Sequence, residues 1–518
     1  MNIQPSLAEF TTLARAASVV PVWGELLADL DTPVSAFLKL DDGRTSFLLE
    51  SVEGEEKVAR FSFLGSRPRL LFTSRGHQIE VQERLDTTRP RVRRYQAARD
   101  PLEELARLMK GFRAAPVPGL PRFCGGLVGY LGYNVVRFLE RIPAHPKDTL
   151  EIPDLMMMLT ESMVIFDHAK HKMLLVVNAF PQGRSSLGPR PRDPSPRIPS
   201  SGEGPAAVYC ACVAQIRAMA KQLRSPVHRR APVVPRRRRA RVRSNVSKTD
   251  FIRMVNRAKR DIRSGEIIQV VLSQRFECPV RSRPLDVYRA LRSLNPSPYM
   301  YLLRFGSLCL VGSSPEMLVR CEDGQIETRP IAGTRPRGRT AQEDERFIHQ
   351  LVNSPKERAE HLMLVDLGRN DLGRVARIGS VGTPELMAIE KYSHVMHLVS
   401  SIRARLHPGK NAFDVLRAAF PAGTVTGAPK VRAMEIIAEL ERDDRGPYAG
   451  AVGYVSFSGN LDTCITIRTI LMKDGRAYVQ AGAGIVADSN PKREYQETIN
   501  KAKGCLEAID LAEQGLIR

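Results

Sequence analysis

The order of apolar and polar positions predicts a chain that mixes helices with strands. Apolar side chains recur at helical spacing in several segments, and runs typical of strands lie between them. The predicted helices cover residues 101–112, 207–223, 248–263 and 429–440. The predicted strands include 60–65, 70–73, 163–166, 173–179, 267–278, 450–457, 461–472 and 477–483.

The N-terminal part carries short turn and cap signals. Ser6 and Glu9 have capping-box spacing, which predicts a helix start. Residues 36–50 are predicted as two strands around the turn at 41–43. The glycine-rich segment 125–133 lacks the strand–GxGxxG–helix context of a dinucleotide-binding fold, so we expect close backbone packing there.

A helix with a clearly marked start is predicted over residues 354–374. Ser354 suits the N-cap, Pro355 suits the first helical position, and Glu357 falls where a capping-box carboxylate would lie. Glu360 lies one turn beyond Glu357, so the two carboxylates share a helix face.

A second helix near the C-terminus repeats this arrangement. Asn490 or Ser489 caps it, Pro491 opens it, and Glu494 and Glu497 lie three residues apart. Two helices that each offer a pair of carboxylates favour a hard divalent cation such as Mg²⁺, completed by water and an anionic substrate. The alternative is that these are ordinary surface pairs without a metal, because such spacing is common on exposed helices.

The bulk properties are those of a globular protein of 518 residues, of which 43% are hydrophobic. This length corresponds to roughly two to four domains. No apolar run approaches the roughly 20 residues that cross a membrane, and the start of the chain lacks the pattern of an export signal. The eight cysteines are scattered without a complete zinc-site spacing, which indicates reduced thiols in a cytoplasmic protein.

The net charge of +22 is concentrated in one segment. Residues 182–245 hold 15 Lys and Arg against 2 Asp and Glu, and the arginine-rich run at 229–243 dominates them. Binding to nucleic acid or an acidic partner is one interpretation, but the run has no interleaved aromatic residues and matches no nucleic-acid module. We favour a solvated linker. The chain then divides into an N-terminal region at 1–180, a low-complexity and arginine-rich insert with a short helix at 181–246, and a C-terminal domain at 247–510.

Ten sequence blocks in order resemble the chorismate-utilising enzymes. Each block alone is weak evidence for the family, but ten blocks in the family's order and at suitable spacing are specific to it. The blocks are GEIIQVVLSQRF, NPSPYMY, GSSPEML, RPIAGTRPRG, AEHLMLVDLGRNDLGRV, SHVMHL, FPAGTVTGAPK, GPYAGAVGY, IRT and AGAGIVADSNPKREYQET. In the first part of the chain, LLES at 48–51 and FSFLG at 61–65 extend the likeness. Within the family, the chain is most similar to the large, synthase subunit of anthranilate synthases.

The resemblance implies an α+β fold of large, mostly antiparallel sheets flanked by helices, with two lobes around an active-site cleft. It also implies a lyase that converts chorismate and ammonia into anthranilate and pyruvate in tryptophan synthesis. Mg²⁺ is the implied cofactor. Glu360 and Glu497 match its direct ligands, and Glu357 and Glu494 match residues that support the site through waters.

The resemblance assigns further roles to individual residues. Glu316 matches the general acid for the C4 oxygen of chorismate. His397 matches the group that takes the C2 proton as pyruvate is eliminated. The residues that match the substrate cradle are Gly333, Thr334, Thr424, Tyr448, Arg468, Gly482, Gly484 and Lys501. Among these, Tyr448 and Arg468 match the residues that bind the enolpyruvyl carboxylate.

Two positions discriminate between members of the family. Relatives that add water carry a basic lysine where this chain has Gln269, and a neutral amide cannot act as that base but can help to position ammonia. Relatives that make 4-amino-4-deoxychorismate carry a nucleophilic lysine where this chain has Ala332. Both positions favour anthranilate as the product. A 4-amino-4-deoxychorismate synthase remains the alternative function. The alternative interpretation of the two residues is that Gln269 and Ala332 only pack within a strand and a loop.

Ammonia is expected to come from a partner, because the sequence contains no nucleophilic cysteine elbow with His and Glu partners. The resemblance implies a separate glutamine amidotransferase subunit, assembled with this chain into a heterotetramer. It also implies feedback inhibition by tryptophan. The residues that match the inhibitor site are Glu50, Ser51, Asn295, Pro298, Tyr299 and Met300; turns in the protein core are the alternative. Neither nucleic acid nor a membrane is expected as a partner.

Overall fold

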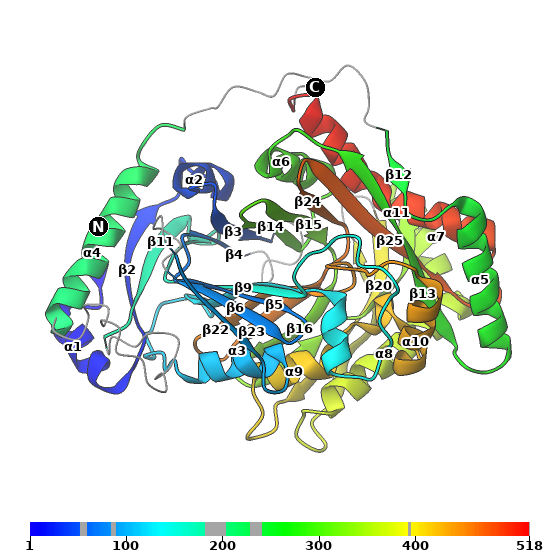
Figure 1. Ribbon diagram of the computed structural model, residues 1–518, viewed down its shortest axis with the longest axis horizontal. Helices are drawn as coiled ribbons and strands as arrows, with labels where there is room; N and C mark the ends of the chain where they lie inside the picture. Colours follow the sequence, from blue (N-terminus) through cyan, green and yellow to red (C-terminus); the bar gives the residue numbers. More distant parts are fainter. Residues whose placement is uncertain (52–59, 84–89, 182–203, 228–240, 392–394, 517–518) are drawn as a thin grey trace.

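The computed structural model describes the chain except for residues 52–59, 84–89, 182–203, 228–240, 392–394 and 517–518. In the described part, two large sheets pack against each other and helices cover their outer faces (Figure 1). Every paired strand within the two sheets runs antiparallel to its described neighbours. The predicted α+β class is therefore confirmed.

The first sheet, called sheet I, has 13 strands among the described residues. Their order is β1 (Ile3–Gln4), β2 (Val20–Leu27), β11 (Lys172–Ala179), β10 (Ser162–Asp167), β4 (Phe61–Ser66), β3 (Thr45–Glu50), β14 (Tyr299–Phe305), β15 (Leu308–Ser314), β24 (Thr469–Lys473), β25 (Arg476–Ile485), β13 (Gln269–Pro279) and β12 (Arg243–Ser244), with β21 (Gly427–Ala428) beside β13.

The second sheet, called sheet II, has 12 strands in the same described ranges. Their order is β18 (Ile331–Pro336), β20 (Val395–Arg405), β17 (Gln325–Thr328), β16 (Met317–Glu322), β23 (Leu461–Ile465), β22 (Ala451–Ser456), β8 (Gly126–Leu131), β9 (Leu155–Leu159), β5 (Leu70–Arg75), β6 (Gln78–Glu83) and β7 (Arg91–Gln96), with β19 (Gly382–Lys391) beside β20. Each sheet takes strands from both the N-terminal and the C-terminal part of the chain, so the boundaries predicted at 180 and 247 do not separate the two sheets.

The helices cover both outer faces of the sandwich. Those packed on sheet I are α1 (Leu7–Ala16), α2 (Pro33–Leu40), α4 (Pro205–Leu223), α6 (Pro284–Leu294) and α11 (Pro491–Glu513). Those associated with sheet II are α3 (Pro101–Lys110), α7 (Ala341–Val352), α8 (Pro355–Gly373) and α9 (Ala412–Ala419). Helices α5 (Lys248–Arg263) and α10 (Lys430–Leu440) pack on β13. Two short 3-10 turns cover Tyr133–Phe138 and Gly423–Val425.

The core explains why many strands are apolar throughout rather than alternating. In β10, Met163 and Ile165 pack between the two sheets, whereas Val164 and Phe166 pack toward the helices. Successive side chains of a strand point to opposite faces, and here both faces are buried. The predicted hairpin of β10 and β11 is confirmed, with Ser162 paired with Val177.

The prediction of two strands over residues 36–50 is wrong in its first half. Residues 33–40 form helix α2, whose Thr32 N-cap and Ser35 make a reciprocal capping box. Pro33 at the first helical position fixes a helical φ. Buried side chains at positions 33, 36, 37 and 40 follow the helical period, and local capping therefore outweighs the short apolar run.

The single strand predicted over residues 461–472 is also wrong. The chain forms β23, leaves sheet II at Ile465, and resumes in sheet I as β24 at Thr469. Arg468 in the connection has a left-handed backbone, with φ of 52°. Such a conformation interrupts a strand.

Two other predictions concern residues that the structure covers only in part. Most of the loose segment predicted at 181–206 and of the arginine-rich run at 229–243 lies outside the described residues. The end of that run is described, and Arg243 and Ser244 pair with β13. Among the described residues, no helix is long and apolar enough to cross a bilayer.

Candidate active site

The candidate site lies where the chain crosses between the two sheets. Glu316 lies between β15 of sheet I and β16 of sheet II, and Arg468 lies between β23 and β24. The two crossings are adjacent, because the Ile465 amide donates a 3.0 Å hydrogen bond to the Glu316 carbonyl oxygen. The sheet change therefore brings together two predicted site residues that are about 150 positions apart in sequence.

Glu316 has the electrostatic environment of a neutral acid. Its side chain is buried, and burial raises its pKa to about 8; the Thr424 hydroxyl, the Ile331 backbone and the Lys501 ammonium oppose this increase. The carboxyl group therefore holds its proton at neutral pH. Lys501 and Thr424 were both predicted as substrate-binding residues, and both act on Glu316 here.

His397 has the environment of a neutral base. It lies on β20, opposite Thr334 of β18, and its Nδ1 is 3.1 Å from the carbonyl oxygen of Gly333. A carbonyl only accepts, so Nδ1 carries the proton and Nε2 is the basic nitrogen of the neutral ring. Burial lowers the pKa of His397, and the nearby Arg468 lowers it further.

Arg468 and Lys501 form the cationic side of the site. The Arg468 Nη1 group donates a 2.6 Å hydrogen bond to the Lys501 carbonyl oxygen. Lys501 Nζ donates to the Gly482 carbonyl oxygen at 3.1 Å and lies 2.6 Å from Glu497. Strand β25 and helix α11 thus hold two cations in one region, which suits a substrate with two carboxylates.

The glycines of β25 make room for neighbouring polar groups. A side chain at Gly484 would place its Cβ 2.6 Å from the Gln269 amide nitrogen, and one at Gly482 would place it 2.5 Å from the Tyr448 hydroxyl. Burial raises the pKa of Tyr448 to about 12, so this hydroxyl stays protonated. The Gln269 Oε1 atom is buried and has no hydrogen-bond partner in the described part of the chain. An unused acceptor of this kind suits a donor such as ammonia.

Helices α8 and α11 carry the four predicted metal-binding carboxylates. The two N-caps are as predicted, since Ser354 accepts from the Glu357 amide and Asn490 accepts from the first-turn amides of α11. The capping box predicted for Glu357 is not formed in the described structure, because its carboxylate pairs with Arg335 instead. Burial raises the pKa of Glu360, and Glu357 and Glu494 raise it further.

The same four carboxylates lie among cations. Burial also raises the pKa of Glu494, with a contribution from Glu497. Arg335 pairs with Glu357 at 3.2 Å and Lys356 with Glu360 at 3.8 Å. The described residues contain no group of three ligands already arranged around a metal position. Oxygen donors that raise one another's pKa nevertheless suit a hard divalent cation, because the cation would relieve their repulsion.

A second pocket lies between the sheets and contains most of the predicted inhibitor residues. Its lining is Leu49, Glu50, Ser51, Phe61, Phe63, Pro298, Tyr299, Met300, Tyr301, Arg320, Val452, Gly453, Tyr454, Asp462 and Cys464. The Ser51 hydroxyl is buried and has no partner among the described residues. Glu50 is paired with Arg292 at 3.2 Å. Asn295 does not line this pocket; its amide donates to the Ser313 hydroxyl at 3.0 Å.

Sequence reasoning missed a charged pair in this second pocket. Arg320 of β16 pairs with Asp462 of β23 at 2.8 Å, and the Tyr299 hydroxyl donates to the same carboxylate at 3.0 Å. The available signal was a lone carboxylate in the otherwise apolar or neutral strand LDTCI. Arg445, which is completely buried beside Tyr448, was also missed.

Comparisons with known proteins identify the family of the chain. The chorismate binding enzyme family matches residues 47–507, which extends beyond the predicted domain at 247–510. The anthranilate synthase component 1 of Acetivibrio thermocellus is 46% identical over 99% of both chains, and that of Aquifex aeolicus is likewise 46% identical over 99% of both.

Solved structures show the same relationship. Anthranilate synthase component I from Streptococcus pneumoniae has a TM-score of 0.73 and 36% identity, covering 93% of this chain and 99% of that one. The menaquinone-specific isochorismate synthase from Escherichia coli, at 18% identity and a TM-score of 0.68, covers 97% of this chain and 98% of that one and shares the fold. Sequence blocks, fold and relatives together show that the chain belongs to the chorismate binding enzyme family.

Proposed function

We propose that this chain is the chorismate-consuming component of an anthranilate synthase and forms anthranilate, pyruvate and water from chorismate and ammonia. The observation that carries the proposal is that the site contains one carboxyl group with a raised pKa and one histidine with a lowered pKa. Glu316 keeps its proton to about pH 8, whereas burial keeps His397 neutral with Nε2 as its base. Two titratable groups with pKa values displaced in opposite directions are typical of acid and base roles.

In the first step, ammonia adds at C2 of the chorismate ring and the hydroxyl group leaves from C4. Glu316 donates its proton to the C4 oxygen, which departs as water as the double bonds shift. The proton lost by the attacking nitrogen balances the proton that Glu316 gives. Gln269, whose Oε1 is buried and unsatisfied, would accept a hydrogen bond from the ammonia and orient it.

In the second step, His397 Nε2 takes the C2 proton and the C3–oxygen bond breaks. The ring becomes aromatic, and the released enolpyruvate becomes pyruvate by gaining a proton at carbon. Arg468 and Tyr448 would hold the enolpyruvyl carboxylate, with Lys501 beside them. The cradle would be completed by the backbone of Gly333, Thr334, Gly482 and Gly484 and by Thr424.

Glu360 and Glu497 would hold Mg²⁺, with Glu357 and Glu494 beside them. When bound, the cation supplies positive charge for the ring carboxylate of the substrate. Lys501 would then exchange its contact with Glu497 for one with substrate, which its long and flexible side chain permits. The raised pKa values of Glu360 and Glu494 support this assignment.

The alternative product, 4-amino-4-deoxychorismate, is less well supported. That chemistry would use a lysine nucleophile on β18, where this chain has Ala332. A methyl group forms no covalent adduct with the substrate ring.

The likeness to proteins called component 1 supports a partner component that supplies ammonia from glutamine. A heterotetramer, like the cytoplasmic location, stays a prediction. We expect the purified chain alone to form anthranilate with ammonium chloride and not with glutamine, followed by anthranilate fluorescence. Glutamine-dependent formation by the chain alone would contradict the need for a partner, and failure with both nitrogen sources would contradict the proposed activity.

The second pocket supports feedback inhibition by an aromatic amino acid, as predicted for tryptophan. Its aromatic rings suit an indole, and the Arg320–Asp462 pair and Glu50 offer both signs of charge to a zwitterion. Strand β16 begins directly after Glu316 and carries Arg320, so a short stretch of chain connects the pocket to the proposed acid.

Ser51→Ala is expected to raise the tryptophan concentration for half-inhibition about tenfold, because the ligand would lose a hydrogen bond to a buried hydroxyl that has no partner among the described residues. The uninhibited kcat is expected to stay unchanged. Ser74→Ala is the matched control, since the Ser74 hydroxyl is also buried, has no partner among the described residues and lies outside this pocket. Equal effects of both substitutions, or unchanged inhibition in Ser51→Ala, would contradict the assignment.

A further inference from the structure

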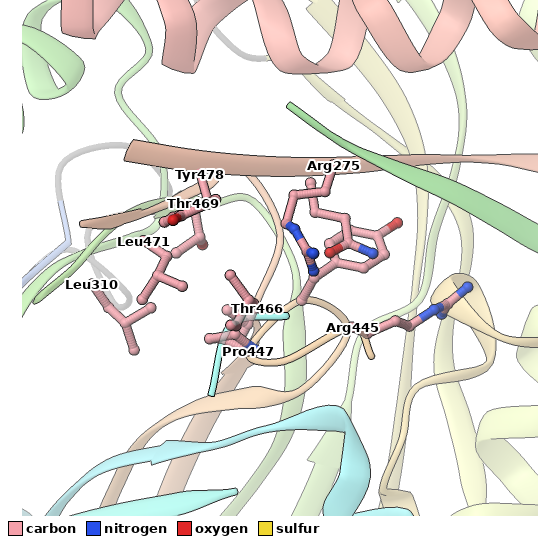
Figure 2. A pocket seen from close by; sticks show the side chains of 11 residues that line it. Arg275, Leu310, Arg445, Pro447, Thr466, Thr469, Leu471 and Tyr478 are labelled. Carbon is pink, nitrogen blue, oxygen red and sulfur yellow. The ribbon is translucent and has the colours of Figure 1, made fainter. Parts of the chain in front are cut away.

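Arg445 is the largest side chain that is completely buried in the described part of the chain. It follows α10 and precedes Tyr448, in the connection to β22. It lines a pocket between the sheets, yet Figure 2 shows its side chain directed away from the other labelled residues of that pocket. Arg445 is not one of the proposed acid, base, metal-binding or substrate-binding residues.

The charge of Arg445 is fully compensated. Its Nε donates to Glu441 Oε2 at 2.8 Å and its Nη2 to Glu441 Oε1 at 2.7 Å, which is a bidentate pair. Glu441 Oε1 also accepts from the Ser273 amide at 2.7 Å, in β13. Buried pairs of this kind are often no more stabilising than apolar residues of similar volume, so stability alone does not explain the arginine.

The remaining donors of the guanidinium reach two elements of the candidate site. Arg445 Nη1 donates to the Val425 carbonyl oxygen at 2.9 Å, in the turn that carries Thr424. Arg445 Nη2 donates to the Val271 carbonyl oxygen at 2.7 Å, two residues beyond Gln269 on β13. Because the guanidinium is planar and rigid, these bonds fix the turn and the strand relative to each other.

The same guanidinium also lies over two aromatic rings. Its central carbon lies 5.4 Å from the ring centre of Tyr448, in the same connection, and 4.9 Å from that of Tyr133. The Tyr448 hydroxyl in turn lies beside Gly482. One side chain therefore links the elements that carry Thr424, Gln269 and Tyr448.

We infer that Arg445 is a positioning residue, which acts through Thr424, Gln269 and Tyr448 to set the geometry of the substrate cradle without touching the substrate. This inference rests on the proposed function. It assigns a specific role to a buried residue outside the predicted site. A displacement of about 1 Å in such a cradle reduces turnover by about 100-fold.

The test compares Arg445→Lys with Arg275→Lys. Arg275 is also buried, lines the same pocket, and donates to the Asp444 carbonyl oxygen at 2.9 Å, but none of its side-chain bonds in the described structure reaches the turn that carries Thr424. Arg445→Lys is expected to lower kcat/KM for chorismate about 100-fold, and Arg275→Lys is expected to lower it less than about threefold. Urea unfolding of both variants separates this effect from lost stability.

A double-mutant cycle shows whether Arg445 acts through the turn. In a Thr424→Ala background, Arg445→Lys is expected to lower kcat/KM by about tenfold or less, because part of what it positions is already gone. The same 100-fold factor in both backgrounds, or equal losses in the Arg445 and Arg275 variants, would overturn the inference.

Hydrogen exchange provides a readout that does not depend on activity. Amides in residues 423–427 are expected to exchange faster in Arg445→Lys than in Arg275→Lys. The two variants are compared at urea concentrations equally far below their unfolding midpoints. Unchanged exchange would overturn the inference even if the wild-type chain proves inactive, whereas wild-type inactivity alone would overturn the proposed function. Glu441→Gln, which keeps the arginine and weakens its pairing, replaces Arg445→Lys if the latter does not fold and is expected to change both readouts in the same direction.

Discussion

Glu316→Gln is expected to lower kcat about 1,000-fold, because glutamine cannot protonate the C4 oxygen that leaves chorismate. Glutamine has nearly the same shape, so the substrate is still expected to bind. Glu277→Gln on β13 is the matched control, since Glu277 pairs with Arg476 at 2.9 Å away from the site and is expected to leave kcat unchanged. A Glu316→Gln variant with more than about a tenth of wild-type kcat would exclude Glu316 as the acid.

The same substitution is expected to stabilise the folded protein at neutral and alkaline pH. The folded-state pKa of Glu316 is raised to about 8 from the ordinary 4.5. Its contribution to stability is therefore fully present below pH 4.5 and is lost as the pH rises toward 8. Relative to its effect below pH 4.5, the substitution is expected to increase the free energy of unfolding at pH 7 by roughly 3 kcal/mol. Urea unfolding of both proteins at pH 5 and pH 7.5 measures it, and a difference that does not grow with pH would contradict the raised pKa.

The pKa of Glu316 also predicts how activity depends on pH. At saturating free ammonia, kcat/KM for chorismate is expected to fall as the pH rises through about 8, where the acid loses its proton. The lowered pKa of His397 is expected to keep this base neutral, and the enzyme active, at pH values below those at which an ordinary histidine becomes protonated.

Glu497→Gln is expected to lower kcat/KM about 1,000-fold at subsaturating Mg²⁺, because one anionic ligand of the proposed metal is lost. Part of the loss is expected to return at high Mg²⁺. Glu507→Gln is the control on the same helix, because Glu507 pairs only with Lys503 in the described structure, at 3.7 Å. Unchanged Mg²⁺ dependence in Glu497→Gln, or full wild-type activity in EDTA, would contradict the assignment.

The parts of the site that depend on local sequence were predictable. Ser354 and Pro355 start one helix and Asn490 and Pro491 start another, so the spacing of Glu357 and Glu360 or of Glu494 and Glu497 places each pair on one face. The resemblance then indicated that the two pairs of carboxylates belong to one Mg²⁺ site. A capping signal involves only three or four neighbouring residues, so it can be predicted without knowledge of distant contacts.

The parts that depend on distant contacts were not predictable in this way. The break at Arg468 arises because β23 and β24 join different sheets, and the apolar residues on both sides give no sign of the change. The bonds from Arg445 to Val271 and Val425 also join segments far apart in sequence. The misassigned helix at 33–40 differs, because its Thr32–Ser35 capping box was present in the sequence and a short apolar run was given more weight.

The central claim is tested most directly by identifying the products formed by the purified chain from chorismate, ¹⁵N-ammonium and Mg²⁺. We expect ¹⁵N-labelled anthranilate and pyruvate in equal amounts, measured by mass spectrometry. In Glu316→Gln at the same protein concentration and time, we expect about 1,000-fold less of both products. A labelled, non-aromatic product that carries its nitrogen at C4, formed without pyruvate, would show that the chain is a 4-amino-4-deoxychorismate synthase. Unlabelled isochorismate would show that water rather than ammonia is the nucleophile.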